Sequence, residues 1–326
     1  MPAPETNLIE RLRARFAGPA MDRLGFGCAH LYGGRKSADS LAIVAAAIDS
    51  GLTYFDTARL YGHGQSERIL GQVLAGRRDK VIIASKVGIL PAAPSLAHRG
   101  AAKSLNVARK VLPGLARHIP KPKPVQPRFG AFSPTDIRAS VETSLRELRT
   151  DYLDILLLHE CSFEQARRQD VSELLEQFVG EGKIRAYGIA TQPDVTLKIA
   201  AERSTGFRVL QFKNDLADET LAQLPVSPDR AVITHSHLGS VFQDFLGFLS
   251  NRADAADVAK AGLDISDPRH IGRQVMSYAL AVNKGGGVLF SSTRSRMIEQ
   301  MAAISEMSSE AQAAMRRLIL AFNSKD

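Results

Sequence analysis

The strongest constraint on the fold is a regular alternation of short apolar segments with longer amphipathic ones. The apolar segments are continuous runs, which is typical of parallel β-strands covered on both faces; they span 23–28, 52–58, 80–88, 152–159, 184–191, 208–214, 231–237 and 286–292. Helical patterns lie between or after them, at 37–50, 66–77, 133–149, 171–182, 193–203, 269–283 and 294–304. Repeats of strand then helix without a break in composition favour a closed α/β fold, the (β/α)8 or TIM barrel, over an open doubly wound sheet.

A single barrel domain over residues 1–326 is therefore the predicted organisation, because no G-x-G-x-x-G sequence follows the first strand as a Rossmann fold would require. Ser133, followed by Pro134 and Asp136, is a typical helix start. Gly51 and Gly182 suit the left-handed residue after a helix. We expect the segments 29–36, 91–132 and 238–268 to be loops that shape the substrate site.

The segment 91–132 is a long, basic, proline-rich insertion after the third strand, and we include it in the barrel domain. It has no Asp or Glu and carries eight basic residues, so the rest of the chain is balanced: 42 − 8 = 34 basic residues against 34 acidic ones. Following the third strand, it would rise from the carboxyl-terminal face of the barrel, where such barrels build their sites. Three roles stay open: a solvated flexible lid, a surface that attracts anionic substrates, or a contact for nucleic acid or anionic membranes.

Other bulk features exclude several classes of protein. No apolar run approaches the roughly 18 residues of a membrane span, and no signal-peptide pattern begins the chain, where a short amphipathic helix is expected instead. Cys28 and Cys161 are the only two cysteines, which rules out a disulfide framework and favours a cytoplasmic protein. Cys161 is expected to be an inert buried thiol. No membrane or nucleic-acid partner is expected, and no His, Cys, Asp or Glu set has the spacing of a metal site.

Four polar residues lie at or just beyond the ends of three predicted strands. Asp56 and Tyr61 follow the second, Lys86 ends the third and His159 ends the fourth. Side chains this polar are seldom buried without partners. Because strand ends of a barrel meet around one mouth, these four should converge there and form a site for proton-transfer chemistry.

The chemistry of each residue suggests a role in reducing a carbonyl group. Tyr61 would act as general acid on the carbonyl oxygen, and the Lys86 ammonium would lower the pKa of its phenol. Asp56 would hold Lys86 charged and oriented. His159 would donate a hydrogen bond to the carbonyl oxygen or relay a proton. The same residues could catalyse the reverse reaction, the oxidation of an alcohol by an alcohol dehydrogenase.

The segment YFDTARLYGHGQSERILGQVL resembles the signature of the aldo-keto reductase family. The resemblance continues through VIIASK, DYLDILLLHE, GKIRAYGIAT and LQFKND, in the family's order, over most of residues 20–305. It implies that Asp56, Tyr61, Lys86 and His159 are the catalytic tetrad. It also implies a nicotinamide dinucleotide cofactor and a small-molecule carbonyl or alcohol substrate. NADPH is preferred to NAD because Arg294 and Arg296 could reach a 2′-phosphate, and the basic insertion would favour an anionic substrate.

The positions that the resemblance assigns to the cofactor depart from the usual family residues. Gln211 matches the carboxamide-binding Gln, whereas Ala190 and Thr191 replace Ser and Asn, and His235 replaces the stacking Tyr. Arg294 and Arg296 are available for a 2′-phosphate near a helix start. The full set of expected cofactor contacts is Gly27, Cys28, Ala190, Thr191, Gln211, His235, Ser236, Leu238, Ser291, Ser292, Thr293, Arg294 and Arg296.

Two alternatives to the NADPH-dependent reductase remain open from the sequence. The first is a sensor or scaffold protein that binds a nicotinamide nucleotide with little turnover, which the departures at the cofactor positions would favour. The second is a sugar or alcohol dehydrogenase that works with NAD.

Overall fold

The structure, a computed structural model, describes residues 4–92, 125–202, 206–225 and 227–324. Eight parallel strands close into a barrel in sequence order, β1 to β8, and β1 pairs with β8. This confirms the predicted (β/α)8 fold. The strands are β1 (Leu24–Gly27), β2 (Tyr54–Asp56), β3 (Ile82–Val87), β4 (Leu153–His159), β5 (Ile184–Ala190), β6 (Val209–Lys213), β7 (Ala231–His235) and β8 (Gly287–Phe290).

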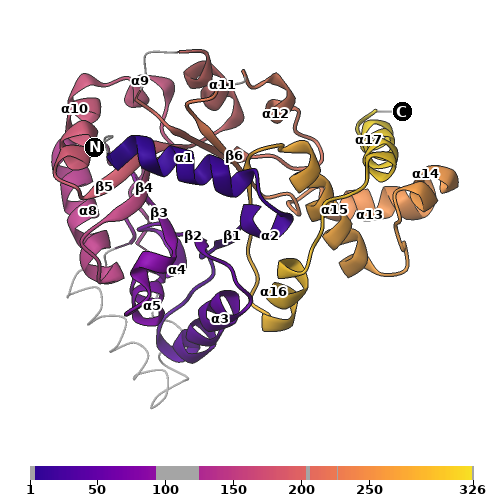
Figure 1. Ribbon diagram of the computed structural model, residues 1–326, viewed down its shortest axis with the longest axis horizontal. Helices are drawn as coiled ribbons and strands as arrows, with labels where there is room; N and C mark the ends of the chain where they lie inside the picture. Colours follow the sequence, from indigo (N-terminus) through magenta and orange to yellow (C-terminus); the bar gives the residue numbers. More distant parts are fainter. Residues whose placement is uncertain (1–3, 93–124, 203–205, 226, 325–326) are drawn as a thin grey trace, which may run out of the picture.

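Helices surround the barrel where the amphipathic patterns predicted them (Figure 1). Ser133 caps the helix that follows it, accepting a hydrogen bond from the backbone N–H of Asp136. Gly51 and Gly182 have φ values of 86° and 71°, as expected after helix ends. The predicted helices are α3 (Ser37–Asp49), α5 (Ser66–Val73), α8 (Pro134–Leu148), α10 (Gln169–Gly180), α11 (Pro193–Ala201), α15 (Pro268–Val282) and α16 (Ser295–Ala302).

The N-terminal helix α1 (Pro4–Phe16) lies across the end of the barrel at which the strands begin (Figure 1). Leu8, Leu12 and Phe16 are buried in one cluster with side chains of the barrel interior, among them Tyr54 and Ile82 at the starts of β2 and β3. The helix therefore closes this end with apolar side chains. The carboxyl ends of the strands face the opposite way.

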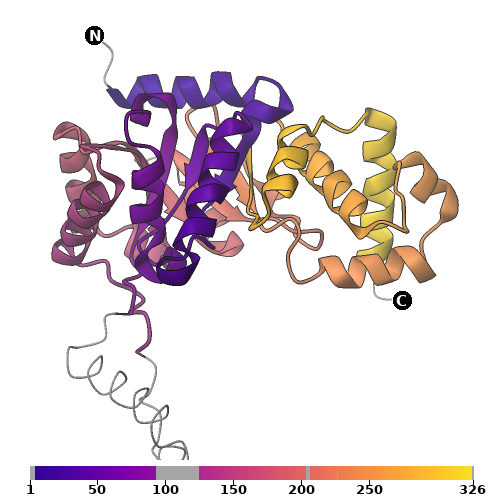
Figure 2. The same cartoon turned by 90° about the horizontal axis from the view of Figure 1, so that it is seen from below.

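The carboxyl-terminal helices form an apolar core of their own beside the barrel (Figure 2). The segment 238–268, expected to be a loop, contains α13 (Phe242–Asn251) and α14 (Ala255–Lys260). Phe245, Phe248 and Leu249 recur at helical spacing and pack with Met315 of α17 (Ser309–Asn323). The loop prediction for 238–268 was wrong, because apolar residues at helical spacing form a buried helix face in this segment.

Short elements complete the described chain. They are α2 (Ala20–Arg23), α4 (Tyr61–Gly64), α9 (Phe163–Ala166), α12 (Thr220–Gln223) and the 3-10 helices η1 (Gly34–Lys36) and η2 (Arg78–Lys80). Most of the basic insertion lies outside the described residues, so its roles stay predictions. Its two ends are joined by an antiparallel bridge between Leu90 and Arg128. None of the described helices is long and apolar enough to cross a membrane.

Candidate active site

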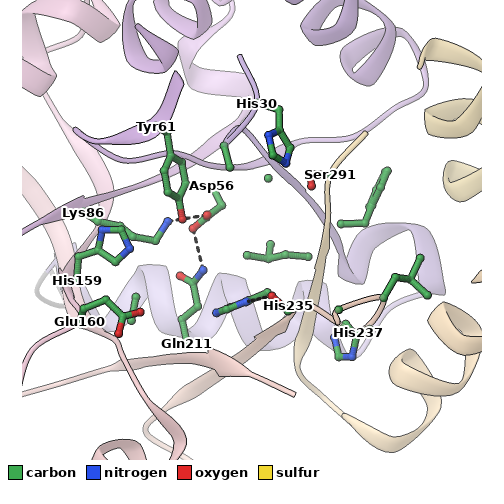
Figure 3. A pocket seen from close by; sticks show the side chains of 18 of the residues that line it. His30, Asp56, Tyr61, Lys86, His159, Glu160, Gln211, His235, His237 and Ser291 are labelled. Atoms are coloured by element: carbon green, nitrogen blue, oxygen red, sulfur yellow. Dashed lines mark hydrogen bonds and ion pairs between the residues drawn. The ribbon is translucent and has the colours of Figure 1, made fainter. Parts of the chain in front are cut away.

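A cavity of about 460 Å³ lies at the carboxyl-terminal ends of the strands. Every strand contributes a residue at or near its end to the wall of this cavity, which is the usual place for a site in such barrels. From β1 to β8 these residues are Gly27, Asp56, Lys86, His159, Ala190, Gln211, His235 and Phe290. Tyr61, at the start of the short helix α4 after β2, completes the group of four predicted from the sequence, and Figure 3 shows all four facing one another.

A buried ion pair lies at the floor of the cavity. The Lys86 ammonium donates to Asp56 Oδ2 at 2.6 Å and to the backbone oxygen of Thr57 at 3.0 Å. Both side chains are nearly fully buried, and Asp56 Oδ1 also accepts from Gln211 Nε2 at 3.1 Å. Burial disfavours the charge on Lys86, but Asp56 and Tyr61 outweigh burial, so the pKa of Lys86 is raised. The ammonium is thus held in its charged form.

Tyr61 lies against this ammonium, with Lys86 Nζ 4.5 Å from the centroid of the phenol ring. Burial raises the pKa of the phenol, and Lys86 lowers it again only in part. The net pKa is therefore above 10, not below it as the sequence suggested. The expected effect of the ammonium is present, but desolvation is larger. Tyr61 is consequently a protonated phenol at neutral pH.

The His159 ring stands edge-on to Tyr61, with 5.8 Å between ring centroids and an interplanar angle of 86°. Burial, together with Lys86 and His235, lowers the pKa of His159 to about 3. Burial and the charges of Lys86 and Lys213 likewise lower the pKa of His235 to about 4. Both imidazoles are neutral at physiological pH, so each carries one N–H donor and one acceptor nitrogen.

Strained backbone occurs directly beside these side chains. Among the described residues other than glycine, four have positive φ, and three of them follow the site residues: His63 after Tyr61, Glu160 after His159 and Ser236 after His235. Such conformations are uncommon outside glycine and gather at functional sites. The fourth, Arg149, ends helix α8.

A buried polar network supports the floor from behind. Glu67 of α5 accepts from Ser85 Oγ at 2.6 Å and forms an ion pair with Arg59. Ser66 Oγ shares a hydrogen bond of 2.9 Å with Thr57 and donates to the backbone oxygen of Cys28. These contacts fix the segment 57–67, which carries Tyr61, against the strand that carries Lys86.

The residues expected to hold the cofactor divide into two groups in this structure. Gly27, Ala190, Gln211, His235, Ser236, Leu238 and Ser291 line the cavity. Cys28, Thr191, Ser292, Thr293, Arg294 and Arg296 do not. The Thr191 hydroxyl donates to the backbone oxygen of Cys161 at 2.7 Å, and the buried Cys28 thiol, whose pKa burial raises, points to the backbone oxygen of Phe26.

One buried atom in the cavity wall is left without a partner. Gln211 is 2% exposed and its Nε2 donates to Asp56, while its Oε1 accepts no hydrogen bond from any residue that the structure describes. A buried acceptor of this kind fits a ligand with an N–H donor. The primary carboxamide of a nicotinamide ring supplies such a donor, so this position fits that group.

Several lining residues were not expected from the sequence, among them Glu160, His237 and Met276. Glu160 directly follows His159, so its place after a predicted strand end was a signal available in the sequence. Met276 comes from α15, and no local pattern places that helix beside the mouth. Within the described part of the chain, no group of His, Cys, Asp and Glu has the arrangement of a metal site.

A second cavity, of about 420 Å³, lies between α15, α17 and the segment 214–222. His237 belongs to the walls of both cavities. Its side chain is 4% exposed, and Nε2 lies 3.1 Å from Thr234 Oγ1. This histidine therefore joins the barrel mouth to the carboxyl-terminal helices.

Comparison with known proteins agrees with this architecture. Residues 23–319 match the model of the aldo/keto reductase family. An aldo-keto reductase of Bacillus subtilis is 29% identical over 179 residues, which are 53% of this chain and 44% of the relative. A methylglyoxal reductase of Escherichia coli is 31% identical over 150 residues, 46% of this chain and 38% of the relative. The chain spans less than half the length of these two curated relatives.

Solved structures are similar over nearly the whole chain. An aldo/keto reductase from Klebsiella pneumoniae, in complex with NADP and acetate, superposes with a TM-score of 0.62 and 21% identity, covering 92% of this chain and 91% of that one. At this identity the likeness concerns the fold. The family match over 23–319, together with the closed barrel, shows that the chain belongs to the aldo/keto reductase family.

Proposed function

We propose that this protein reduces the carbonyl group of a small aldehyde, ketone or sugar to an alcohol, with NADPH as reductant. The observation that carries the proposal is the contact of Tyr61 with the buried Lys86–Asp56 pair at the mouth of the barrel. A neutral phenol beside a fixed ammonium is a proton donor whose conjugate base is stabilised at once. The family match and the NADP complex of the Klebsiella pneumoniae protein support the choice of reaction and cofactor.

Each residue of the site has its own role in the proposed reaction. Tyr61 gives its proton to the carbonyl oxygen, and Lys86 stabilises the phenolate that remains. Asp56 keeps Lys86 in place, and Gln211 in turn holds Asp56. His159, neutral because its pKa is about 3, donates its N–H to the carbonyl oxygen and orients the substrate. The phenol and the imidazole would thus both donate to the carbonyl oxygen, with the ammonium beside the phenol.

The cofactor fits this wall at the residues that line it. Gln211 Oε1 would accept the carboxamide N–H, and His235 would lie against the nicotinamide ring, with the loop 236–238 and Ser291 further along. When bound, the nicotinamide supplies the hydride. Arg294 and Arg296, at the start of α16, remain candidates for the 2′-phosphate. Ala190 offers no polar group and the Thr191 hydroxyl is used by Cys161, so Gln211 is left to hold the carboxamide alone.

The reaction is tested by following the absorbance of NADPH during incubation with a panel of aldehydes, ketones and aldoses. We expect oxidation of NADPH by at least one class and a weaker response with NADH. A protein that reduces no member of the panel would contradict the proposal.

A second candidate is a nucleotide-binding protein with little turnover, which the departures from the usual family residues at the cofactor positions favour; the Thr191 hydroxyl, for example, donates to the backbone oxygen of Cys161. It predicts tight binding of NADPH in a fluorescence titration without oxidation by any carbonyl compound. The third reading, an NAD-dependent sugar or alcohol dehydrogenase, predicts reduction of NAD by aldoses or alcohols at a rate above that with NADP.

A further inference from the structure

Glu160 and His159 are neighbours in sequence, yet both side chains face the same cavity (Figure 3). Successive side chains of an extended strand point to opposite sides. At the end of β4 the chain escapes this rule because Glu160 has a φ of 52°, in the left-handed region. Its backbone N–H donates to the oxygen of Ala190 at 2.8 Å, which fixes the turn. The strained backbone therefore delivers a carboxylate to the mouth.

This carboxylate dominates the charge of the cavity wall. Asp56 and Lys86 form an ion pair with each other, and the pKa values of His159, His235 and His237, about 3, 4 and 4, leave these rings neutral. Among the lining residues that the structure describes, Glu160 is the acidic one outside that pair, and no ion pair balances its charge; His30 is the remaining ionisable residue of the wall. The wall is therefore negative beside His159.

A neutral neighbour positions the Glu160 carboxylate without cancelling its charge. Gln192, just before α11, donates from Nε2 to Glu160 Oε2 at 2.6 Å. One oxygen is thus anchored, and Oε1 is free to accept hydrogen bonds within the described part of the chain. A fixed carboxylate oxygen accepts strongly from hydroxyl groups and repels other anions.

We propose that Glu160 determines the substrate class: it accepts hydrogen bonds from the hydroxyl groups of a neutral, polyhydroxylated aldehyde or ketone, and it disfavours carbonyl compounds that carry a carboxylate or phosphate. This inference rests on the proposed function. It runs against the expectation that the basic insertion selects anionic substrates. The two hypotheses predict opposite preferences, so one set of substrates separates them.

The experiment compares the wild type with Glu160→Gln on three aldehydes. These are glyceraldehyde, which is neutral and hydroxylated; butanal, which is neutral and lacks hydroxyl groups; and succinic semialdehyde, which carries a carboxylate. We expect Glu160→Gln to raise kcat/KM for succinic semialdehyde about tenfold. It should lower kcat/KM for glyceraldehyde by roughly threefold to tenfold and leave butanal within about twofold.

Glu164→Gln is the matched control, because it makes the same charge change four residues along, in α9, away from the cavity wall. It should leave the ratios of kcat/KM between the three substrates unchanged. Glu160→Asn provides a second neutral variant whose side chain tolerates left-handed backbone. Thermal unfolding followed by circular dichroism verifies that each variant is folded.

The outcomes distinguish failure of the Glu160 inference from failure of the proposed function. Unchanged substrate ratios in both Glu160 variants, or equal changes in Glu164→Gln, would overturn the inference while the proposed function stands. A wild-type preference for succinic semialdehyde over glyceraldehyde would overturn it in favour of the basic insertion. If the wild type reduces none of these aldehydes nor any other carbonyl compound, the proposed function fails and the inference falls with it.

Discussion

At the scale of single residues, burial has a larger effect on protonation around the cavity than any one neighbouring charge. It raises the pKa of Tyr61 despite Lys86 and lowers the pKa of His159 and His235 to about 3 and 4. For Lys86 burial is again the largest single effect, but Asp56 and Tyr61 together outweigh it and raise the pKa. The result is one buried ion pair, Lys86 with Asp56, beside a neutral phenol and neutral imidazoles, which suits proton donation to an oxygen that gains negative charge.

Tyr61→Phe removes the proposed acid and leaves the ring. Turnover should fall about 10² to 10⁴-fold, the usual cost of losing a positioned acid, while the Kd for NADPH measured by fluorescence stays the same. Tyr54→Phe is the matched control, because the hydroxyl of Tyr54 is buried at the start of β2 and has no hydrogen-bond partner among the described residues. Full activity in Tyr61→Phe would show that another group supplies the proton.

His237 should make the folded state sensitive to acid. Burial and the neighbouring His235 lower its pKa to about 4, whereas the unfolded value is near 6.5. Between these two values the unfolded chain binds a proton that the folded one does not. Stability is therefore lost as pH falls from about 6.5 toward 4, by about 1.4 kcal/mol per pH unit for each such histidine.

Urea unfolding at several pH values across this window measures the slope. His237→Gln should reduce the slope by about one proton, because its amide does not titrate. A slope identical to that of the wild type would mean that His237 does not carry this pH dependence.

At the scale of helices and strands, a close approach between α5 and α8 determines how α5, the helix after the segment that carries Tyr61, packs. A Cβ added to Gly71 in α5 would lie 2.5 Å from the backbone oxygen of Glu147 and 2.7 Å from the Leu148 backbone in α8. The two helices therefore touch at a point where only glycine fits. Because α5 also carries Glu67 and Ser66, this contact holds the support of the site in place.

Gly71→Ala should destabilise the protein by about 1–3 kcal/mol through overpacking, although alanine has the higher helix propensity. Gly247→Ala is the opposite case: it lies exposed within α13 with no atom near a new Cβ, so it should stabilise by up to about 1 kcal/mol. Denaturant midpoints of both variants against the wild type test the pair. Equal effects of the two substitutions would refute the contact.

The strands, which are covered on both faces, were predictable from the sequence. The helices near the carboxyl terminus were harder to predict. The continuous apolar runs located all eight strands, and strand ends located the four polar residues of the floor. The Phe245 and Phe248 pattern of α13 was missed, because an apolar helix face does not reveal its partner helix. The position of Glu160 after a strand end was visible in the sequence, but the direction of its side chain depends on a φ value that strand alternation does not predict.

At the scale of the whole molecule, the two ends of the barrel have different tasks. α1 fills the end where the strands begin with apolar side chains, and the chemistry lies at the other end. Substitutions that change stability and substitutions that change activity should therefore fall at opposite ends of the barrel. The single barrel domain including 91–132 stays a prediction, since most of that insertion lies outside the described residues.

Leu12→Ala tests this separation. Leu12 is fully buried in the cluster that closes the barrel, so its truncation should cost about 2–5 kcal/mol of unfolding free energy. The KM and kcat of the folded fraction should match the wild type. A change in KM at unaltered stability would mean that the closed end communicates with the mouth.

Arg23 links distant parts of the sequence. Its buried guanidinium donates to the backbone oxygens of Leu280, Asn283 and Gly286 and forms an ion pair with Glu306. A protein truncated after β8 would lose Glu306 and leave the buried Arg23 guanidinium, just before β1, without its counter-ion. The segment 280–306 therefore stabilises the residues that precede the first strand, so a change to either segment affects the other.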